Sequence, residues 1–246
     1  FDRHGRVQQP SDLLYKKNIM VLRGSFRPIT YVGFDMLKAG FGLFKKEVGF
    51  DRNKKDETEV LCEITLNNLI DEGSFDERDF LDRVDILSGM GQDVMISNFR
   101  EFYKLAEWFR RFKTGQIRMI IGAATFKNVL EPVYYKDLHG GILEAFGKLF
   151  SENLRVYVYP AKDPDTCVVY NCRNIPVQDG LRNLYSHLLS NHLVMDIPNC
   201  REEVLPWFSH VVLGKMKNQD HEWESMVPRY VSSFIKSKNL FGYRQE

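Results

Sequence analysis

A glycine-containing turn near the start of the chain carries the residue types that hold phosphate groups. Gly24 and Ser25 lie between the apolar segment Ile19–Leu22 and the amphipathic stretch Phe34–Phe44. A strand, a glycine turn and a helix start in this order bring backbone amides close to a ligand, and the helix adds partial positive charge. The sequence therefore indicates a phosphate-binding turn. Plain packing of a strand against a helix is the alternative interpretation.

The same turn offers few groups that could assist a reaction. Arg23 and Arg27 are the charged residues of the segment Arg23–Thr30, and the segment contains no histidine. Sites that transfer phosphorus groups add charged or imidazole side chains that stabilise the charge of the reacting phosphate. The turn thus predicts binding of a phosphate more directly than its transfer.

The elements that would position this turn alternate along the first 160 residues. Five short segments rich in Val, Ile and Met lack polar alternation, as do strands buried on both faces. This alternation predicts right-handed crossovers and an α/β, Rossmann-like, doubly wound, mostly parallel five-stranded sheet; a half TIM barrel has the same periodicity and stays an alternative. The predicted strands are Ile19–Leu22, Val60–Ile64, Val94–Ile96, Arg118–Gly122 and Leu154–Tyr159, and the predicted helices are Asp35–Val48, Asp76–Met90, Phe99–Phe112 and Tyr134–Phe150.

The pattern changes after Pro160. A hairpin at Cys167–Cys172 is expected there, followed by a helix at Gly180–Asn191 and a helical pair at Glu203–Lys217 and Val227–Lys238. We therefore predict an N-terminal extension, residues 1–17, and one α/β domain, residues 18–246. Within that domain, residues 18–160 form the sheet core and residues 161–246 form the hairpin and a helical C-terminal cap.

Composition restricts the classes of partner. The 246 residues carry a formal net charge of +1, so no global basic field indicates nucleic acid, and no apolar run reaches the ~18 residues that a membrane span needs. Because the sequence starts with Phe1 and has no initiator Met, a processed or trimmed chain is expected.

Cysteine usage indicates a reducing compartment, either the bacterial cytoplasm or an organelle matrix. Cys167 and Cys172 flank the predicted hairpin and could form a zinc half-site or a disulfide. Neither a second CxxC pair nor a CxxH pair accompanies them, so no metal site is assigned.

Motifs spread over more than two hundred residues resemble those of the nicotinate-nucleotide adenylyltransferases. That family opens with Gly-Gly-Thr/Ser-Phe-Asp-Pro-Ile-His and a following Gly-His, and it has later Arg-x-x-Met-Leu, Ile-Gly-Ala-Asp-Asn-Leu, Ile-Ser-Ser-Thr-x-x-Arg and Val-Pro-x-x-Val-x-x-Tyr-Ile patterns. The chain also resembles a group of bacterial proteins that carry this label by similarity. The segments that carry the resemblance are Gly24–Ile29, Phe80–Leu87, Arg118–Phe126 with Tyr134–Leu138, Phe208–Lys215 and Met226–Phe241.

The resemblance implies a nucleotidyltransferase fold and transfer of AMP from ATP, with Mg²⁺, to a mononucleotide. Several positions depart from the family's pattern. Thr30 stands at the first histidine, Ala124 at the carboxylate, and Gly214 at the arginine, with Lys215 beside it as a substitute point charge. Because losing one stabilising donor costs about 10²–10³ in rate, two or three losses would leave transfer negligible.

Three hypotheses about function follow. The favoured hypothesis is a catalytically degenerate nucleotidyltransferase-like domain that serves as an accessory or scaffold subunit of a larger assembly or homo-oligomer, with or without retained nucleotide binding. The alternative is an active nicotinate or nicotinamide mononucleotide adenylyltransferase that uses ATP and Mg²⁺. A module that senses a nucleotide without reacting is a third hypothesis. The resemblance and the turn together assign nucleotide binding to Arg23, Gly24, Ser25, Phe26, Arg27, Gly122 and Ser209, with Thr30 and Lys215 as degenerate catalytic positions.

Overall fold

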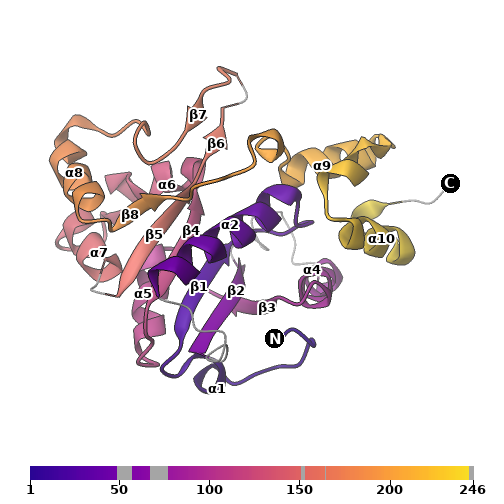
Figure 1. Ribbon diagram of the computed structural model, residues 1–246, viewed down its shortest axis with the longest axis horizontal. Helices are drawn as coiled ribbons and strands as arrows, with labels where there is room; N and C mark the ends of the chain where they lie inside the picture. The colour runs from indigo at the N-terminus through magenta and orange to yellow at the C-terminus, as the bar shows by residue number, and fades with distance from the viewer. Residues whose placement is uncertain (49–56, 67–76, 151–152, 164, 244–246) are drawn as a thin grey trace.

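A six-stranded parallel sheet forms the centre of the computed structural model (Figure 1), which describes residues 1–48, 57–66, 77–150, 153–163 and 165–243. The strand order is β3-β2-β1-β4-β5-β8, and every neighbouring pair is parallel. This is the order of a doubly wound Rossmann sheet. The strands are β1 (Asn18–Arg23), β2 (Thr58–Thr65), β3 (Asp93–Ser97), β4 (Ile117–Gly122), β5 (Leu154–Tyr159) and β8 (Val194–Asp196).

Helices cover both faces of the sheet, and each face has its own core. Alternate residues of a strand point to opposite faces. In β1, accordingly, Ile19 and Val21 belong to one buried cluster and Met20 and Leu22 to the other. The first cluster packs against α5, α6, α7 and α8, and the second packs against α2, α4, α9 and α10. The continuous apolar run of β1 thus follows from burial on both faces.

Short connections and helices complete the chain. The small antiparallel pair of β6 (Ala161–Lys162) and β7 (Val169–Tyr170) projects beyond the sheet (Figure 1). The helices are α1 (Pro10–Leu14), α2 (Tyr31–Glu47), α4 (Glu77–Gly89), α5 (Phe102–Arg110), α6 (Ala123–Val129), α7 (Gly141–Leu149), α8 (Arg182–Ser190), α9 (Ser209–Lys217) and α10 (Arg229–Lys238), with 3₁₀ turns η2 (Pro132–Tyr135), η3 (Asp179–Leu181), η4 (Glu202–Val204), η5 (His221–Met226) and η6 (Leu240–Gly242).

The predicted fold class is confirmed, and the open sheet excludes the half-barrel alternative. The predicted count of five strands is wrong, because β8 adds a sixth strand beside β5. This strand has three residues and lies within the segment assigned to the cap, too short to give a periodic signal. All five predicted strands are present.

The predicted helix at Tyr134–Phe150 is wrong at its start, since η2 and α7 are separate elements with residues 136–140 between them, and α7 begins only at Gly141. Helix α6 was not expected. The hairpin pairs residues 161–162 with 169–170, so Cys167 lies in its loop. Asp76, the first residue predicted for α4, lies outside the described residues.

The cysteine alternatives of the sequence analysis do not hold in this structure. Cys167 is exposed, Cys172 is buried, and both are free thiols. Burial, with a further contribution from the Asp196 carboxylate, raises the pKa of Cys172 to about 12. In the part of the chain with described coordinates, no cluster of three or more His, Cys, Asp or Glu residues could hold a metal ion. Within the same part, no helix is long and apolar enough to cross a membrane.

Two glycines of α2 lead to a prediction about packing. A Cβ atom at Gly40 would lie 2.4 Å from Ile120 Cδ1 on β4, whereas a Cβ atom at Gly42 would meet no atom within 4 Å. Gly40→Ala is therefore expected to destabilise the fold by about 1–3 kcal/mol through overpacking. Gly42→Ala should stabilise it by about 0.5–1 kcal/mol, because alanine loses less backbone entropy in a helix. Urea unfolding of the two variants measures the change in unfolding free energy for each. An equal change for both would contradict this account of the α2–β4 contact.

Candidate functional site

The strand order reverses direction between β1 and β4, and a cavity opens at the carboxyl ends of these strands. In open α/β sheets this switch point is where ligands bind. The cavity has a volume of about 360 Å³. We call it the switch-point cavity; its described lining consists of Arg23, Gly24, Ser25, Thr65, Arg100, Phe102, Ile120, Ile121, Gly122 and Thr125. Four of the seven residues assigned to nucleotide binding, Arg23, Gly24, Ser25 and Gly122, therefore meet in one place.

Gly24 packs closely against a ring of the same turn. A Cβ atom there would lie 3.0 Å from the ring of Phe26, tighter than nine in ten real contacts, so a larger residue would require the ring to shift. Phe26 is itself buried in the core on the α2 side, with a φ of 49°. The Phe26 side chain thus supports the turn from below and does not line the cavity described above.

Arg23 is held by a buried acid. Its Nε and Nη2 atoms donate to the two carboxylate oxygens of Glu63 at 2.7 and 2.9 Å, and its Nη1 donates to the carbonyl of Arg100 at 2.9 Å. The guanidinium carbon lies 4.3 Å from the centre of the Phe102 ring. Glu63 is fully buried and also accepts a hydrogen bond from the Ser97 hydroxyl. The positive charge of Arg23, which the sequence analysis assigned to phosphate binding, is therefore offset by the neighbouring Glu63 carboxylate.

Arg100 is a cation at this site that sequence reasoning missed. It follows β3 on an exposed loop, and its side chain forms no ion pair or hydrogen bond with any residue the structure describes. The carboxyl ends of parallel strands meet at one edge, which brings Arg100 to the cavity although it is far from the turn in sequence. Arg100 falls at the start of the predicted helix Phe99–Phe112, and its position four residues after the predicted strand Val94–Ile96 was the signal that could have revealed it.

Arg27 points away from the switch-point cavity toward α4. Its Nε donates to Asp79 Oδ1 at 2.6 Å, while Asp79 Oδ2 accepts from Arg83 Nε at 2.7 Å. Arg83 is buried and donates from Nη1 to the carbonyl of Ser25 at 3.3 Å. This chain of charges fixes the backbone of the turn, which gives Arg27 a positioning role there.

Ser209 and Thr30 both lie outside the switch-point cavity. The Ser209 hydroxyl, at the start of α9, donates to the carbonyl of Pro28 at 2.8 Å and so ties α9 to the turn. Thr30 is buried and precedes α2, but its hydroxyl does not cap the helix. Neither residue belongs to the described lining of the switch-point cavity.

Lys215 is neutralised on the surface of α9. Its Nζ lies 2.6 Å from Asp220 Oδ2 and 2.5 Å from Glu222 Oε2. These two hydrogen bonds raise the pKa of Lys215, so the ammonium is strongly retained and doubly paired. A substitute for the arginine of the Ser-Ser-Thr-x-x-Arg pattern would have to release both carboxylates first.

Two further cavities are lined by residues that belong to, or directly follow, the segments of the switch-point cavity. One, of about 460 Å³, shares Arg100, Phe102 and Thr125 with it and extends to η2. The other, of about 860 Å³, begins at Ala123 and Ala124 directly after Gly122; we call it the hairpin cavity. The remaining described lining of the hairpin cavity is Lys127, Ala161, Lys162, Asp163, Cys167, Tyr170, Ile175, Pro176, Pro206, Phe208, His210 and Val211.

Comparison with known proteins adds a likeness of fold. No protein-family model and no curated protein matches the chain. Among solved structures, Plasmodium falciparum nicotinic acid mononucleotide adenylyltransferase complexed with APC is similar over 94% of this chain and 100% of its own, with a TM-score of 0.53 and 14% identity. The chain has a nicotinic acid mononucleotide adenylyltransferase-like fold. The same P. falciparum enzyme complexed with NaAD covers the same shares with a TM-score of 0.49 and 15% identity.

An adenylyltransferase-like fold directs attention to Mg²⁺, because that ion commonly bridges nucleotide phosphates and one or two carboxylates. Glu63 is the buried carboxylate closest to the turn in the strand register, paired with Arg23 across β1 and β2. Both its oxygens accept hydrogen bonds from Arg23, and one also accepts from Ser97. Among the described residues at the switch point, Glu63 thus does not fit as a ligand of a protein-bound magnesium ion, because its oxygens are already committed to protein donors.

Proposed function

We propose that this adenylyltransferase-like domain binds a nucleotide at the switch point without transferring its AMP group, and that it serves as an accessory subunit of a larger assembly. The observation that supports this most is the coexistence of two features. Gly24, Ser25 and Gly122 still line a cavity of about 360 Å³, while Arg23, one of the two cations of the turn, is bonded to Glu63.

Two features of this site could give affinity for a nucleotide, namely a cation for its phosphate and an apolar space for its base. Arg100 supplies a cation at the rim of the switch-point cavity, and the cavity itself lies where doubly wound sheets hold phosphates. The hairpin cavity next to it offers an apolar space of about 860 Å³, which is within the size range of small-molecule sites. A nucleotide would place its phosphate at Arg100 and its base in the hairpin cavity.

For adenylyl transfer, the candidate catalytic positions do not offer the charge-stabilising groups that the reaction needs. Adenylyl transfer depends on groups that stabilise charge on the reacting phosphate, each contributing about 10²–10³ in rate. Thr30 is buried away from the cavity lining, and Lys215 is paired with Asp220 and Glu222. Ala124 has no carboxylate to offer.

An accessory role is consistent with apolar groups left on the surface beside the site. Val133 and Tyr134 on η2 and Leu143 on α7 are 62, 52 and 66% exposed, and η2 packs against α7. Exposed apolar residues that gather on one surface are typical of protein contacts. In this role a partner would respond to whether the nucleotide is bound.

Calorimetry with AMP and ATP, each with and without Mg²⁺, tests the binding half of the proposal. We expect one nucleotide at the switch point, and Arg100→Gln should weaken it about tenfold by removing a charge-assisted hydrogen bond. Arg111→Gln is the matched control, because Arg111 is an exposed arginine at the end of α5 outside the cavities. Equal affinities in all three proteins would contradict phosphate binding at Arg100.

A product assay tests the other half. Incubation with ATP, Mg²⁺ and nicotinate mononucleotide should give no dinucleotide above the uncatalysed background. Turnover at about 1 s⁻¹ or faster, the range of ordinary enzymes, would establish the active adenylyltransferase instead. Binding without turnover supports the proposal, and absence of both overturns it.

A further inference from the structure

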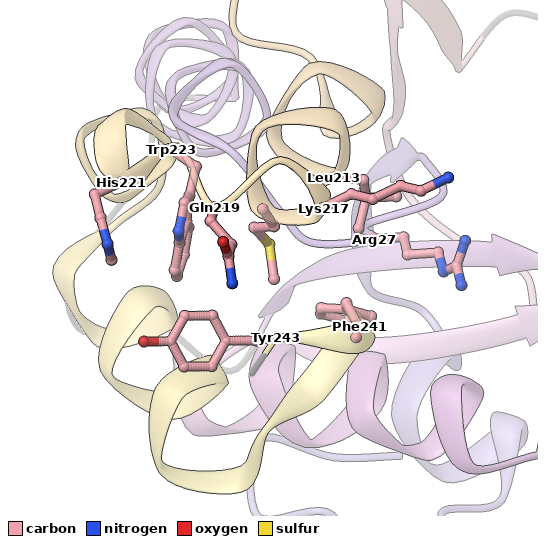
Figure 2. Close-up of a pocket in the computed structure, with 10 residues that line it drawn as sticks. Arg27, Leu213, Lys217, Gln219, His221, Trp223, Phe241 and Tyr243 are labelled. Carbon is pink, nitrogen blue, oxygen red and sulfur yellow. The ribbon is translucent and has the colours of Figure 1, made fainter. Parts of the chain in front are cut away.

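A second cavity, formed by the C-terminal elements, shares no residue with the switch-point cavity. It has a volume of about 720 Å³ and lies between α9, η5 and the end of η6 (Figure 2). We call it the tail cavity; its described lining is Arg27, Leu213, Met216, Lys217, Gln219, His221, Trp223, Phe241, Gly242 and Tyr243. This volume is well within the range of small-molecule sites.

One end of the tail cavity is aromatic. Figure 2 shows the rings of Trp223 and Tyr243 there, with His221 beside them. The Trp223 and Tyr243 rings meet edge to face, with centroids 5.9 Å apart. Trp223 is only 1% exposed, so it backs this wall from inside the protein, and the half-buried Tyr243 ring is the one that can face a ligand. Rigid aromatic walls of this kind favour a flat ring.

The other end carries positive charge. Figure 2 shows Arg27 and Lys217 extending from it. Lys217 is exposed at the last turn of α9 and forms no ion pair or hydrogen bond within the described parts of the chain. Arg27 is held in place by Asp79 at 2.6 Å, and Asp79 is held in turn by Arg83.

The charge of this lining is unbalanced. Asp79 offsets one of the two cations, and none of the described lining residues is a carboxylate. A site with a flat apolar end and a net cationic end is complementary to an aromatic molecule that carries an anionic group. Neutral aromatic compounds would leave Lys217 without a partner, and small inorganic anions would leave the aromatic end empty.

We infer that the tail cavity is a second ligand site, for an aromatic anion of mononucleotide size whose ring lies against Tyr243, which Trp223 supports, and whose anionic group lies at Lys217 and Arg27. It is separate from the proposed nucleotide site, from which it differs in every lining residue. Adenosine 5′-monophosphate is a suitable probe, because adenosine and inorganic phosphate each represent one half of it.

Titration of the full chain, followed by tryptophan emission, tests this site. We expect AMP to change the emission, with Trp223 as the reporter, and adenosine and inorganic phosphate to bind at least tenfold more weakly. Lys217→Gln should raise the AMP dissociation constant about tenfold through loss of a charge-assisted contact. Lys46→Gln, an exposed lysine in the last turn of α2, is the matched control and should not change it.

Arg100→Gln separates this inference from the proposed function. If it leaves the emission change intact while Lys217→Gln weakens that change, the tail cavity is the site. If Lys217→Gln has no effect, or if inorganic phosphate alone binds as well as AMP, the inference is overturned. Loss of the signal in Arg100→Gln alone would likewise overturn it while supporting nucleotide binding at the switch point. Circular dichroism of each variant verifies that it is folded.

Discussion

Replacing Glu63 with Gln is expected to raise the affinity of the switch-point cavity for a phosphate by about tenfold to a hundredfold. In the wild-type chain the Glu63 carboxylate occupies the Nε and Nη2 donors of Arg23 at 2.7 and 2.9 Å. A charge about 6 Å from a bound anion contributes up to about 3 kcal/mol at an effective dielectric constant of 20. Solvent at the cavity mouth reduces this, and about 1.4–2.8 kcal/mol corresponds to the expected change in affinity.

The same substitution should weaken the fold. Glu63 is fully buried, and removing one partner of a buried ion pair costs about 3–5 kcal/mol. Because the Gln carbonyl can still accept one hydrogen bond from Arg23, the lower part of that range is expected. The gain in binding and the loss in stability would thus have one physical cause, the uncovered charge of Arg23.

Calorimetry with inorganic phosphate and AMP, combined with urea unfolding, measures both effects. Glu59→Gln is the control, since Glu59 is also buried on β2 and pairs with Lys17 at 2.5 Å, four residues before Glu63. It should lower stability without changing phosphate affinity. An unchanged affinity in Glu63→Gln would show that Arg23 does not face the bound anion.

Replacing Arg118 with Met is expected to cost about 3–5 kcal/mol of folding free energy, because it leaves a buried carboxylate without its main partner. Arg118 is only 2% exposed, and its Nε donates to Glu47 Oε2 at 2.7 Å. Its Nη1 also donates to the carbonyls of Ile117 and Asn153 at 2.8 and 3.2 Å. This network joins the end of α2 to the start of β4, opposite the switch-point edge.

The loss of folding free energy in Arg118→Met should depend on pH. Burial raises the pKa of Glu47, but the hydrogen bond and charge of Arg118 outweigh it, and the net pKa lies below the usual value of 4.5. A lowered pKa stabilises the fold above pH 4.5 and loses that contribution as the pH falls through the folded pKa. In Arg118→Met most of the interaction that lowers the pKa of Glu47 is gone. Protonating Glu47 at lower pH therefore removes much of the destabilisation in this variant.

Urea unfolding of wild type and Arg118→Met between pH 7 and pH 4 is the measurement. The difference in unfolding free energy should be largest at neutral pH and narrow as the pH falls toward 4. Arg155→Met is the control; Arg155 contacts Glu47 at 3.1 Å but is more exposed, so its loss should be below about 1 kcal/mol. A difference that stays constant over this range would mean that Glu47 does not carry the effect.

The alternation of buried strands and amphipathic helices was enough to predict the fold class and the five strands β1 to β5. Each of these strands is an apolar run buried on both faces, and that pattern is local in sequence. The strand β8 and the helix α6 were missed because they lack such a local pattern. They are short, and packing against elements that are already formed determines them.

The glycine turn after β1 could also be predicted from the sequence, because a glycine next to a strand end is a local signal for close backbone approach. Gly24 and Ser25 do line the switch-point cavity. The charged partners of this turn could not be predicted in the same way. The sequence shows Arg23 as a cation, and only the pairing of β1 with β2 reveals Glu63 beside it.

The sequence alone therefore determined the five longer strands, most of the long helices, and where the chain turns at a glycine, since these depend on period and on local backbone preference. Tertiary structure decided which charges are available. Arg100 reaches the site and Lys215 does not, because the order of strands brings one loop to the switch point while carboxylates of the next turn hold the other side chain. Coulomb interactions depend on distance in space, and the residues at those distances come from strands and loops far apart along the chain.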